Sequence, residues 1–455
     1  MIKIQNYSEV EEEFFQGRNF TDSNDVVKSV LEEVKKRGDS ALRLYGNKFD
    51  VSVPAVFEVA QEELKAAAEK FKIQKRDVYD ALVYSHDLAL KFAKKQRASF
   101  TDFEDELEPG LFTGQKTIPV ETAGCYVPAG RFPLVSTVIM TVTPAVAAGV
   151  KNVIMCTPPR VHPDDKVQAE KQGAGISGKA YVGGKPYVDE GIMAAAYICG
   201  VNHLYAVGGS QAVAAMAYGT ESIPKVDVIV GPGNKFVASA KREVYGTVGI
   251  DMIAGPTEVL IIADKSANPA WVAADLLAQA EHDVVAQPIL VTDDEEFAQK
   301  VSYEIEEQLE TLTTKATARQ SVDNCGKIIL VNKIEDAAEV ANRKAPEHLE
   351  LALDDNEIRA KLEKSVHNFG SLFIGHYSAE VFGDYAAGLN HTLPTSGTAR
   401  YTGGLSVRVF LKTVTTLRSV KASSGMLKSA VASGYLGDAE GLAGHARAAR
   451  LRIDK

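Results

Sequence analysis

The stretch "EVLIIADKSANPAWVAADLLAQAEHDVVAQPILVT" (258–292) decides the fold. It opens with the apolar run "EVLIIA" (258–263), continues through an Ala- and Leu-rich segment at 268–281, and closes with the apolar run "PILVT" (288–292). The outer runs are short and hydrophobic without alternation, which is typical of strands covered on both faces. A helix between two such strands favours a parallel sheet. The stretch therefore predicts one strand–helix–strand unit of an α/β protein.

The same alternation continues on both sides of this unit. Further β-branched apolar runs lie at 152–156, 203–207, 226–230 and 327–331. Breaks rich in Gly and Pro, "GPGN" (231–234) and "AGPTE" (254–258), divide the pattern, so we expect two doubly wound units with parallel sheets. The predicted helices between the runs are 137–149, 188–200, 210–219, 234–245, 268–281 and 294–311.

The flanking regions read differently. A capped amphipathic helix is predicted at 22–38, and two more helices follow near 61–73 and 76–97. The polar, Gly-rich stretch at 161–186 is longer than the usual connection and is expected to be a surface loop, with a substrate lid as the alternative. From about residue 404 onward, "SVRVFLKTV", "MLKSAVASGYL" and "AEGLAGHARAARLR" predict a helical arm and not a third sheet.

Composition excludes several classes of protein. A formal net charge of −10 over 455 residues provides no broad basic face for nucleic acid or for an anionic membrane. No apolar run reaches the ~18 residues that a spanning helix needs, and the acidic N-terminus is unlike a secretory signal. The four cysteines are scattered without a CxxC pair, which favours a reducing cytoplasm. Cys125 and Cys156 are flanked by apolar residues, so inert packing is expected for both.

Two Gly-rich turns could hold a phosphate. "VGGSQAVAA" (207–215) and "VGPGNKFVASA" (230–240) each lie between a predicted strand and a predicted helix. Free amides at a helix N-terminus suit an anion, and Gly allows close approach of the backbone. Neither turn contains GxGxxG, and tight strand-to-helix turns explain them equally well.

Four polar segments could carry chemistry. Gln279 and His282, three residues apart, project from one face of the predicted helix 268–281. In "APEHLE" (345–350), Glu347 and His348 could both move protons near neutral pH, although an adjacent Glu-His pair is more often structural.

The third and fourth segments lie nearer the C-terminus. Asp384 and His391 occupy a loop at 382–397, where ordinary turn roles are the alternative. Glu440 and His445 stand five apart on the predicted C-terminal helix, on different faces, so a solvated helix is the default interpretation. Together the four segments offer nitrogen and oxygen ligands without thiolate, which suits a zinc ion with open coordination positions.

Several long motifs now show a resemblance. "GPGNKFVASAKREVYGTVGIDMIAGPTEVLIIAD", "DLLAQAEHD", "APEHLEL", "NHTLPTSGTARYTGGLSV" and "EGLAGHARAARLR" resemble histidinol dehydrogenases and follow the family's order from about residue 120 to 450. The resemblance implies a homodimeric enzyme, dependent on NAD and zinc (Zn2+), that oxidises an alcohol through an aldehyde to a carboxylate at shared active sites.

The resemblance also implies roles for individual residues. His348 would be the general base, and Glu347 would activate the water that adds to the aldehyde. The implied zinc ligands are Gln279, His282, Asp384 and, from the partner's arm, His445. The implied NAD contacts are Tyr126, Gln211 and Asn234, and the implied substrate contacts are Ser136, Thr257, His391 and Glu440 together with Gln279, His282, His348, Asp384 and His445.

The implied fold has two incomplete Rossmann-like domains with an N-terminal helical segment and an exchanged helical C-terminal arm. The expected boundaries place the N-terminal segment at 1–30 and the arm at 404–455. Residues 31–126 and 257–403 would form the domain that carries the zinc and the base, and 127–256 would form the domain that binds NAD.

Departures from the family pattern leave the substrate open. The chain has "PAG" (128–130) followed by Arg131 where the family usually has "PGG", and Thr257 where it usually has Ser. Part of the arm resembles a sister group that oxidises 2,3-dihydroxypropanesulfonate, and Arg131 or Arg408 could bind a sulfonate. Glu440 suits an imidazole or an amine, which favours L-histidinol. A non-catalytic binding protein and a metal-free dehydrogenase are the remaining alternatives.

Overall fold

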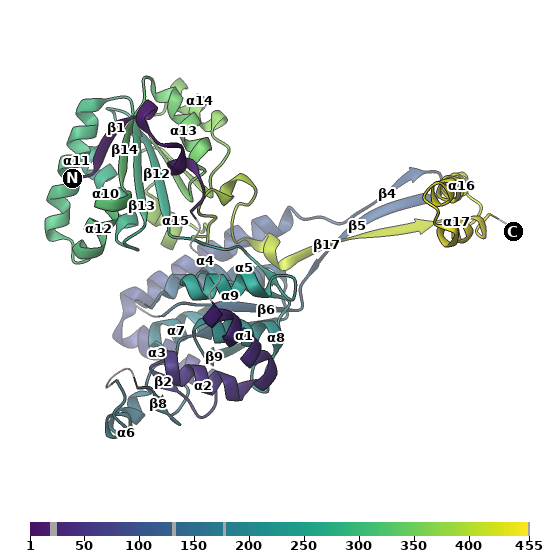
Figure 1. Cartoon of the computed structure of the whole chain (residues 1–455), viewed down its shortest axis with the longest axis horizontal. Helices are drawn as coiled ribbons and strands as arrows, with labels where there is room; N and C mark the ends of the chain where they lie inside the picture. The colour runs from purple at the N-terminus through teal and green to yellow at the C-terminus, as the bar shows by residue number, and fades with distance from the viewer. Residues whose placement is uncertain (19–24, 130–132, 176–178, 454–455) are drawn as a thin grey trace.

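Two six-stranded sheets form the body of the molecule (Figure 1). The computed structural model describes residues 1–18, 25–129, 133–175 and 179–453. All neighbours in the first sheet, here called the β12 sheet, are parallel. Its order is β1 (Lys3–Asn6), β14 (Lys327–Leu330), β13 (Gln287–Thr292), β12 (Glu258–Ala263), β15 (His348–Ala352) and β16 (Ser371–Ile374).

Helices cover both faces of the β12 sheet, which explains its continuous hydrophobic strands. Val259 and Ile261 of β12 pack on one side with α10 (Pro269–Ala280), α11 (Glu295–Thr311) and α12 (Lys315–Cys325). Leu260 and Ile262 pack on the other side with α13 (Ala337–Lys344) and α14 (Glu357–Ser365). The strand–helix–strand prediction at 258–292 is therefore confirmed.

The second sheet, here called the β6 sheet, is also covered on both faces. Its order is β11 (Gly249–Ile250), β10 (Val228–Val230), β6 (Thr122–Tyr126), β7 (Asn152–Thr157), β9 (His203–Ala206) and β3 (Glu58–Val59), with only β3 antiparallel among these described strands. One face carries α3 (Gln61–Gln74), α4 (Arg76–Ala98), α5 (Val135–Ala148) and α7 (Glu190–Cys199). The other face carries α1 (Asp25–Arg37), α2 (Asp39–Phe49), α8 (Gly209–Tyr218) and α9 (Lys235–Val244).

The N-terminal region is divided between the two sheets in a way that the expected boundaries do not capture. Residues 1–30 do not form one helical segment, because β1 pairs with β14 at the edge of the β12 sheet. Residues 31–126 do not join 257–403, because α1 to α4 pack on the β6 sheet beside residues of 127–256. α3 packs against α7, α4 against α5, and α1 and α2 against α8, so the apolar faces of these helices are covered on the β6 sheet.

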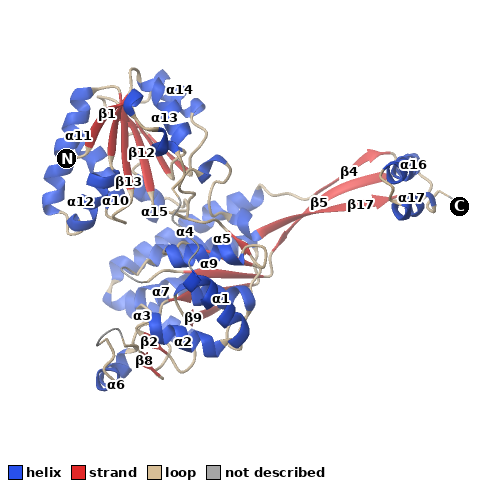
Figure 2. Cartoon of the chain, viewed as in Figure 1, coloured by secondary structure: helices blue, strands red, loops and turns tan. Residues whose placement is uncertain are grey.

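A third sheet projects from the body as an arm (Figure 2). It contains β4 (Phe103–Glu108), β5 (Leu111–Pro119) and β17 (Leu411–Ser419), all antiparallel, and its tip carries α16 (Ser424–Ala439) and α17 (Ala443–Arg450). The prediction of an entirely helical arm is therefore wrong. The segment "SVRVFLKTV" includes two buried residues at the base of the arm, Val407 and Phe410, and then the start of the exposed strand β17. The apolar residues of these two parts together resemble one helical pattern.

The long stretch at 161–186 has some structure of its own. It contains α6 (Lys166–Lys171) and β8 (Tyr181–Val182), and β8 pairs with β2 (Ser52–Val53). Figure 1 places α6 and β8 at the end of the β6 unit remote from α15 (Glu380–Tyr385). Within the described ranges, no helix is long and apolar enough to cross a membrane.

A buried ion pair fixes one turn at the edge of the β6 sheet. The side chains of Lys241 and Asp251 are 3% and 0% exposed, and Lys241 Nζ binds both the Asp251 carboxylate and the carbonyl of Gly231, the latter at 2.9 Å. The Asp251 carboxylate also accepts a hydrogen bond from Gly231 N at 2.8 Å.

Replacing one partner of this pair should destabilise the fold. We expect Asp251→Asn to lower the free energy of unfolding by about 3 kcal/mol, because it leaves the Lys241 ammonium buried without a counter-charge. Urea denaturation measures the change. The exposed pair of Lys300 and Glu296 provides the control: Glu296→Gln should cost less than about 0.5 kcal/mol. Equal effects of the two substitutions would show that the buried pair has no special role.

Candidate functional site

The predicted catalytic pair lies at the amino-terminal edge of the β12 sheet. His348 begins β15 and pairs in register with Val259, one residue beyond the start of β12. Gln279 is buried in the last turn of α10, the helix that leads to the start of β13. α15 brings Asp384 and Glu380 to the same edge. Side chains from β15, α10 and α15 therefore meet here.

Glu347 is held in one orientation by two donors. The hydroxyl of Thr257 donates to Glu347 Oε2, and the backbone N–H of Glu258 donates to the same oxygen at 3.0 Å. Burial raises the pKa of Glu347 to about 7, although the charge of His348 and both hydrogen bonds oppose the shift. A carboxyl that titrates near neutrality can both accept and release a proton.

His348 is a buried imidazole among carboxylates. Its Nδ1 lies 3.3 Å from the carbonyl oxygen of Glu258, whereas its Nε2 lies 3.4 Å from Asp384 Oδ1. Burial lowers the pKa of His348, but Glu347, Asp384 and Glu380 raise it more strongly, to about 10. With Nδ1 donating to the backbone, Nε2 is the atom that can exchange a proton with a ligand.

Gln279 connects the pair to α15. With its amide oriented so that both ends are satisfied, Gln279 donates to Glu380 Oε1 at 3.0 Å and accepts from the backbone N–H of Glu258 at 3.1 Å. In this orientation its amide oxygen also lies beside the Thr257 hydroxyl, which donates to Glu347. Gln279, Thr257 and Glu347 thus form one continuous polar cluster.

Two further histidines border this cluster. His282 is exposed just beyond α10, and its Nδ1 lies 2.9 Å from Ala278 O. His391 Nε2 lies 3.2 Å from the Ser136 hydroxyl on α5. Burial raises the pKa of Asp384, but the adjacent His348 and the charges of His391 and His282 lower it overall. The structure therefore brings most of the predicted substrate and metal residues to one place.

The donor set at this place fits a divalent cation. His348 Nε2 and Asp384 Oδ1 are buried without a hydrogen-bond partner, and at 3.4 Å they are too far apart to satisfy each other well. Three carboxyl groups (Glu347, Glu380 and Asp384) act on one imidazole, and burial raises the pKa of Glu380 well above its usual range, so a bound cation would stabilise the ionised carboxylates. Nitrogen and oxygen donors without thiolate suit zinc with open positions.

The set is incomplete within one chain. Among the described residues, no three His, Cys, Asp or Glu side chains stand close enough to hold a metal ion by themselves. Glu440 and His445 are both exposed at the tip of the arm, and Figure 1 shows α16 and α17 far from α10 and α15. The structure therefore does not bring these two residues to the cluster of their own chain.

The three predicted cofactor residues lie at the carboxyl edge of the β6 sheet. Tyr126 ends β6, and its hydroxyl accepts a hydrogen bond from Gly209 N at 3.1 Å. Gln211 lies in the first turn of α8, after β9, and is buried. Asn234 caps α9, after β10, by accepting from the N–H groups of Phe236 and Val237. The carboxyl edge of a parallel sheet is where dinucleotides bind.

Loop contacts join this edge to the β12 sheet. His391 meets Ser136, and the neighbouring Asn390 donates its side-chain amide to Met140 O at 2.7 Å. Thr395 accepts a hydrogen bond from Gly255 N at 2.6 Å, just before β12. The amino edge of one sheet and the carboxyl edge of the other therefore share a boundary, as a reaction between a substrate and a cofactor requires.

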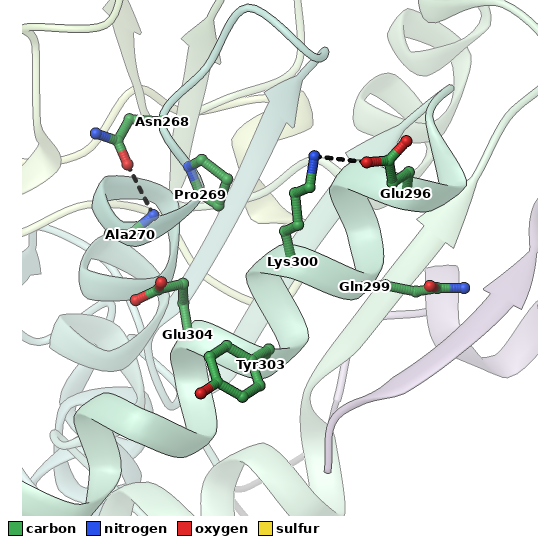
Figure 3. Close-up of a pocket in the computed structure, with 8 residues that line it drawn as sticks. All are labelled: Asn268, Pro269, Ala270, Glu296, Gln299, Lys300, Tyr303 and Glu304. Carbon is green, nitrogen blue, oxygen red and sulfur yellow. Dashed lines mark hydrogen bonds and ion pairs between the residues drawn. The ribbon is translucent and has the colours of Figure 1, made fainter.

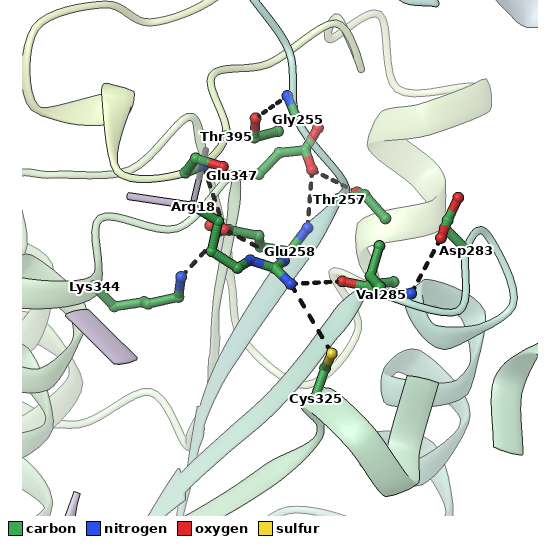
Figure 4. A network of polar contacts seen from close by, with 12 residues as sticks. Arg18, Gly255, Thr257, Glu258, Asp283, Val285, Cys325, Lys344, Glu347 and Thr395 are labelled. Carbon is green, nitrogen blue, oxygen red and sulfur yellow. Dashed lines mark hydrogen bonds and ion pairs between the residues drawn. The ribbon is translucent and has the colours of Figure 1, made fainter. Parts of the chain in front are cut away.

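Sequence analysis missed the charged residues that support the cluster (Figure 4). Glu258 and Lys344 are both buried, and Lys344 Nζ donates to Glu258 Oε1 at 3.1 Å. The guanidinium of Arg18 lies 4.0 Å from the same Glu258 oxygen and donates to Val285 O at 2.8 Å. One signal was present: Glu258 is a charged residue that opens an otherwise apolar run.

The remaining sequence expectations have mixed outcomes. Cys125 and Cys156 are buried, and burial raises the pKa of both thiols, that of Cys125 to about 12, so inert packing is confirmed. Arg408 is exposed, and Arg131 lies outside the described residues. A cavity of about 450 Å³ between α10 and α11 contains none of the predicted residues (Figure 3). It is lined by Asn268, Pro269, Ala270, Glu296, Gln299, Lys300, Tyr303 and Glu304.

Comparison with known proteins gives consistent results. The family model described as histidinol dehydrogenase matches residues 16–453. The chain is 44% identical to a histidinol dehydrogenase of Streptococcus mutans over 94% of this chain and 92% of that protein. It is 42% identical to one of Lactiplantibacillus plantarum with the same coverage. The crystal structure of histidinol dehydrogenase from Elizabethkingia anophelis matches with a TM-score of 0.87 at 34% identity, over 100% of this chain and 98% of that one.

The contact between Thr257 and Glu347 can be tested directly. We expect Thr257→Val to raise the pKa of Glu347 by about one further pH unit, because the substitution removes a donor that stabilises the carboxylate. Carboxyl carbon NMR of protein labelled at Glu measures the titration, and Glu347→Gln assigns the signal. Thr413→Val, on the exposed strand β17, is the matched control and should leave it unmoved. A lower or unchanged pKa in Thr257→Val contradicts the expectation.

Proposed function

The chain belongs to the histidinol dehydrogenase family, and from that premise we propose that it oxidises L-histidinol through the aldehyde to L-histidine in two successive hydride transfers to NAD. The observation that carries the proposal is the buried group of Glu347, His348 and Asp384 at the boundary with the cofactor edge of the β6 sheet. When bound, NAD supplies the hydride acceptor for both steps.

His348 is the group that we assign to proton transfer with the substrate alcohol. Its Nδ1 faces the carbonyl of Glu258, so the ring orientation is fixed and Nε2 points to the Asp384 side of the site. In the first step Nε2 takes the proton of the substrate hydroxyl, and hydride leaves the carbon that carries this hydroxyl. In the second step it takes a proton from the hydrated aldehyde.

Glu347 is the group that we assign to water activation. Thr257 and the backbone N–H of Glu258 both bind Oε2, which leaves Oε1 without a protein donor among the described residues. With its pKa raised to about 7, this carboxylate is basic enough to take a proton from the water that adds to the aldehyde.

We assign the metal site to Gln279, His282 and Asp384 of one subunit and to the partner subunit's His445. When bound, zinc supplies a positive charge that orients the heteroatoms of the substrate. The unpartnered Asp384 Oδ1, the exposed His282 and the imbalance of charge around His348 support this assignment.

A homodimer with exchanged arms follows from the same assignment. Glu440, which caps α16, and His445 of α17 are both exposed at the end of the projecting arm. A two-fold dimer would place each arm on the body of the other subunit, and Glu440 would then face the imidazole or amine of the substrate.

The alternatives have less support. The curated relatives named above are histidinol dehydrogenases. Arg408, one of the two arginines considered for binding a sulfonate, is exposed on the surface. A binding protein without catalysis would not need Glu347 and His348 to be buried together. A metal-free dehydrogenase would leave Asp384 Oδ1 unexplained. All four cysteines are free, so we propose the cytoplasm as the compartment.

Substrate and stoichiometry test the proposal. Purified protein with L-histidinol should form two NADH for each histidinol consumed, because the alcohol loses four electrons. The kcat/KM for 2,3-dihydroxypropanesulfonate should be at least about tenfold lower, since a sulfonate lacks the group that Glu440 would bind. A higher value for the diol would reject histidinol as the substrate.

Variants of the catalytic pair separate the two steps. His348→Asn should lower both oxidations by about 100-fold or more, because both need the same base. Glu347→Gln should impair aldehyde oxidation far more than alcohol oxidation, and equal losses would contradict the division of roles. Assays that start from the alcohol or from the aldehyde distinguish these outcomes.

Complementation tests the exchanged arm. His445→Ala and His282→Ala subunits are expected to be inactive and depleted of zinc as pure proteins. Refolding them together should restore about a quarter of the activity and of the zinc content, because half of the dimers are mixed and each mixed dimer has one intact site. The control mixture of Gln279→Ala with His282→Ala should stay inactive, since both changes lie on the body. No recovery in the first mixture argues against a shared site.

A further inference from the structure

Asp50 lies beside the predicted cofactor residues although it comes from a distant part of the chain. It follows the last residue of α2, and its backbone N–H donates to Gly46 O at 2.9 Å. Its Oδ2 accepts a hydrogen bond from Gln211 Nε2 at 3.1 Å. A Cβ added to Gly208 would lie 3.0 Å from Asp50 Oδ1, so the carboxylate packs directly against the glycine turn before α8.

The turn that Asp50 contacts is closely packed and needs glycine. Gly209 has a φ of +65°, and its N–H is held by the Tyr126 hydroxyl. A side chain at Gly208 would also collide with Pro158 at 2.9 Å. Gly208 is buried and Gly209 is half-buried at the start of the ten-residue helix α8, so the carboxylate and the turn are packed together. A carboxylate at this point is adjacent to the place where a dinucleotide lies in this type of sheet.

The carboxylate of Asp50 has fewer donors than it can bind. Burial raises its pKa to about 7, and the hydrogen bond from Gln211 is the only interaction that opposes this shift. In the described part of the chain, no Lys or Arg forms an ion pair with it. The nearby Arg43 instead donates to the carbonyls of Pro54 and Ala55 and stacks on Phe57.

A carboxylate without a neighbouring cation would bind the two hydroxyls of a ribose better than a ribose that carries a phosphate. The two hydroxyls of a ribose can each donate a hydrogen bond to a carboxylate that lacks donors. A phosphate on the ribose would instead bring about two negative charges beside the carboxylate, with no cation to offset them. The same discrimination is made in common dinucleotide-binding folds by an acidic residue roughly 20 positions after the glycine turn. Here the acid would come from the end of α2, upstream of the turn.

We propose that Asp50 selects NAD over NADP by accepting hydrogen bonds from the hydroxyls of the adenosine ribose and repelling a 2′-phosphate. The inference rests on the proposed function, because it takes Tyr126, Gln211 and Asn234 as the cofactor edge. It adds a residue to that edge and assigns the cofactor preference to it.

Kinetics with both cofactors test the role of Asp50. In Asp50→Asn, the KM for NAD should rise about tenfold with kcat nearly unchanged, because an amide accepts more weakly than a carboxylate. The ratio of kcat/KM for NADP to that for NAD should rise at least about tenfold, since the repulsion is removed. Asp50→Ser repeats the test with a smaller side chain if Asp50→Asn folds poorly. Asp189→Asn, which keeps a helix cap on α7 on the opposite face of the β6 sheet from α8, should leave the ratio unchanged.

Calorimetric titration of NAD and NADP without an alcohol separates this inference from the proposed function. A wild-type protein that prefers NAD in binding, with the preference reduced in Asp50→Asn, supports the inference even where histidinol is not oxidised. Equal losses for NAD and NADP would mean that Asp50 only orients Gln211, and an unchanged preference would mean that it does not face the ribose. Either result overturns the inference.

Discussion

One buried imidazole surrounded by carboxylates is the interaction on which the site depends. His348 is 3% exposed, and the charges of Glu347, Glu380 and Asp384 raise its pKa to about 10 in spite of burial. A base in that state would keep its proton near pH 7. A cation bound beside Asp384 would lower the pKa of His348 toward that range, because it would repel the protonated imidazole. In the proposed site, metal binding and activation of the base would therefore be linked through the same carboxylates.

The position of this imidazole follows from the sheet and not from a flexible loop. His348 begins β15, Glu258 begins β12, and the parallel register of these strands sets the two starts side by side. Glu258 serves three neighbours: its N–H binds Glu347, its carbonyl meets His348 Nδ1, and its carboxylate pairs with Lys344. Burying the Lys344–Glu258 pair is costly unless its geometry is held. The pair holds the backbone of Glu258 in place, and this backbone positions Glu347 and His348.

The sequence was informative wherever a pattern is local. Every apolar run predicted as a strand forms one, because strands covered on both faces leave a continuous hydrophobic signal. The strands of the arm gave no such signal, since β4 and β17 are mostly exposed on both faces. Gln279 and His282 were visible through their helical spacing, whereas Glu380 and Lys344 are single charged residues whose burial depends on distant elements. Asp50 shares no motif with Gln211, 161 positions away, so only the fold could join them.

The arm is anchored in a way that connects it to the site. Phe410 is fully buried in the core of the β6 unit, and its carbonyl accepts a hydrogen bond from Val120 N at 2.9 Å, at the point where β5 and β17 leave the body. Leu405 N donates to Thr392 O at 2.9 Å, one residue beyond His391. The arm therefore starts from rigid packing next to the substrate residues of its own chain. A rigid base fixes the direction in which the arm leaves the body, and in the proposed dimer it would present His445 to the second copy in one orientation.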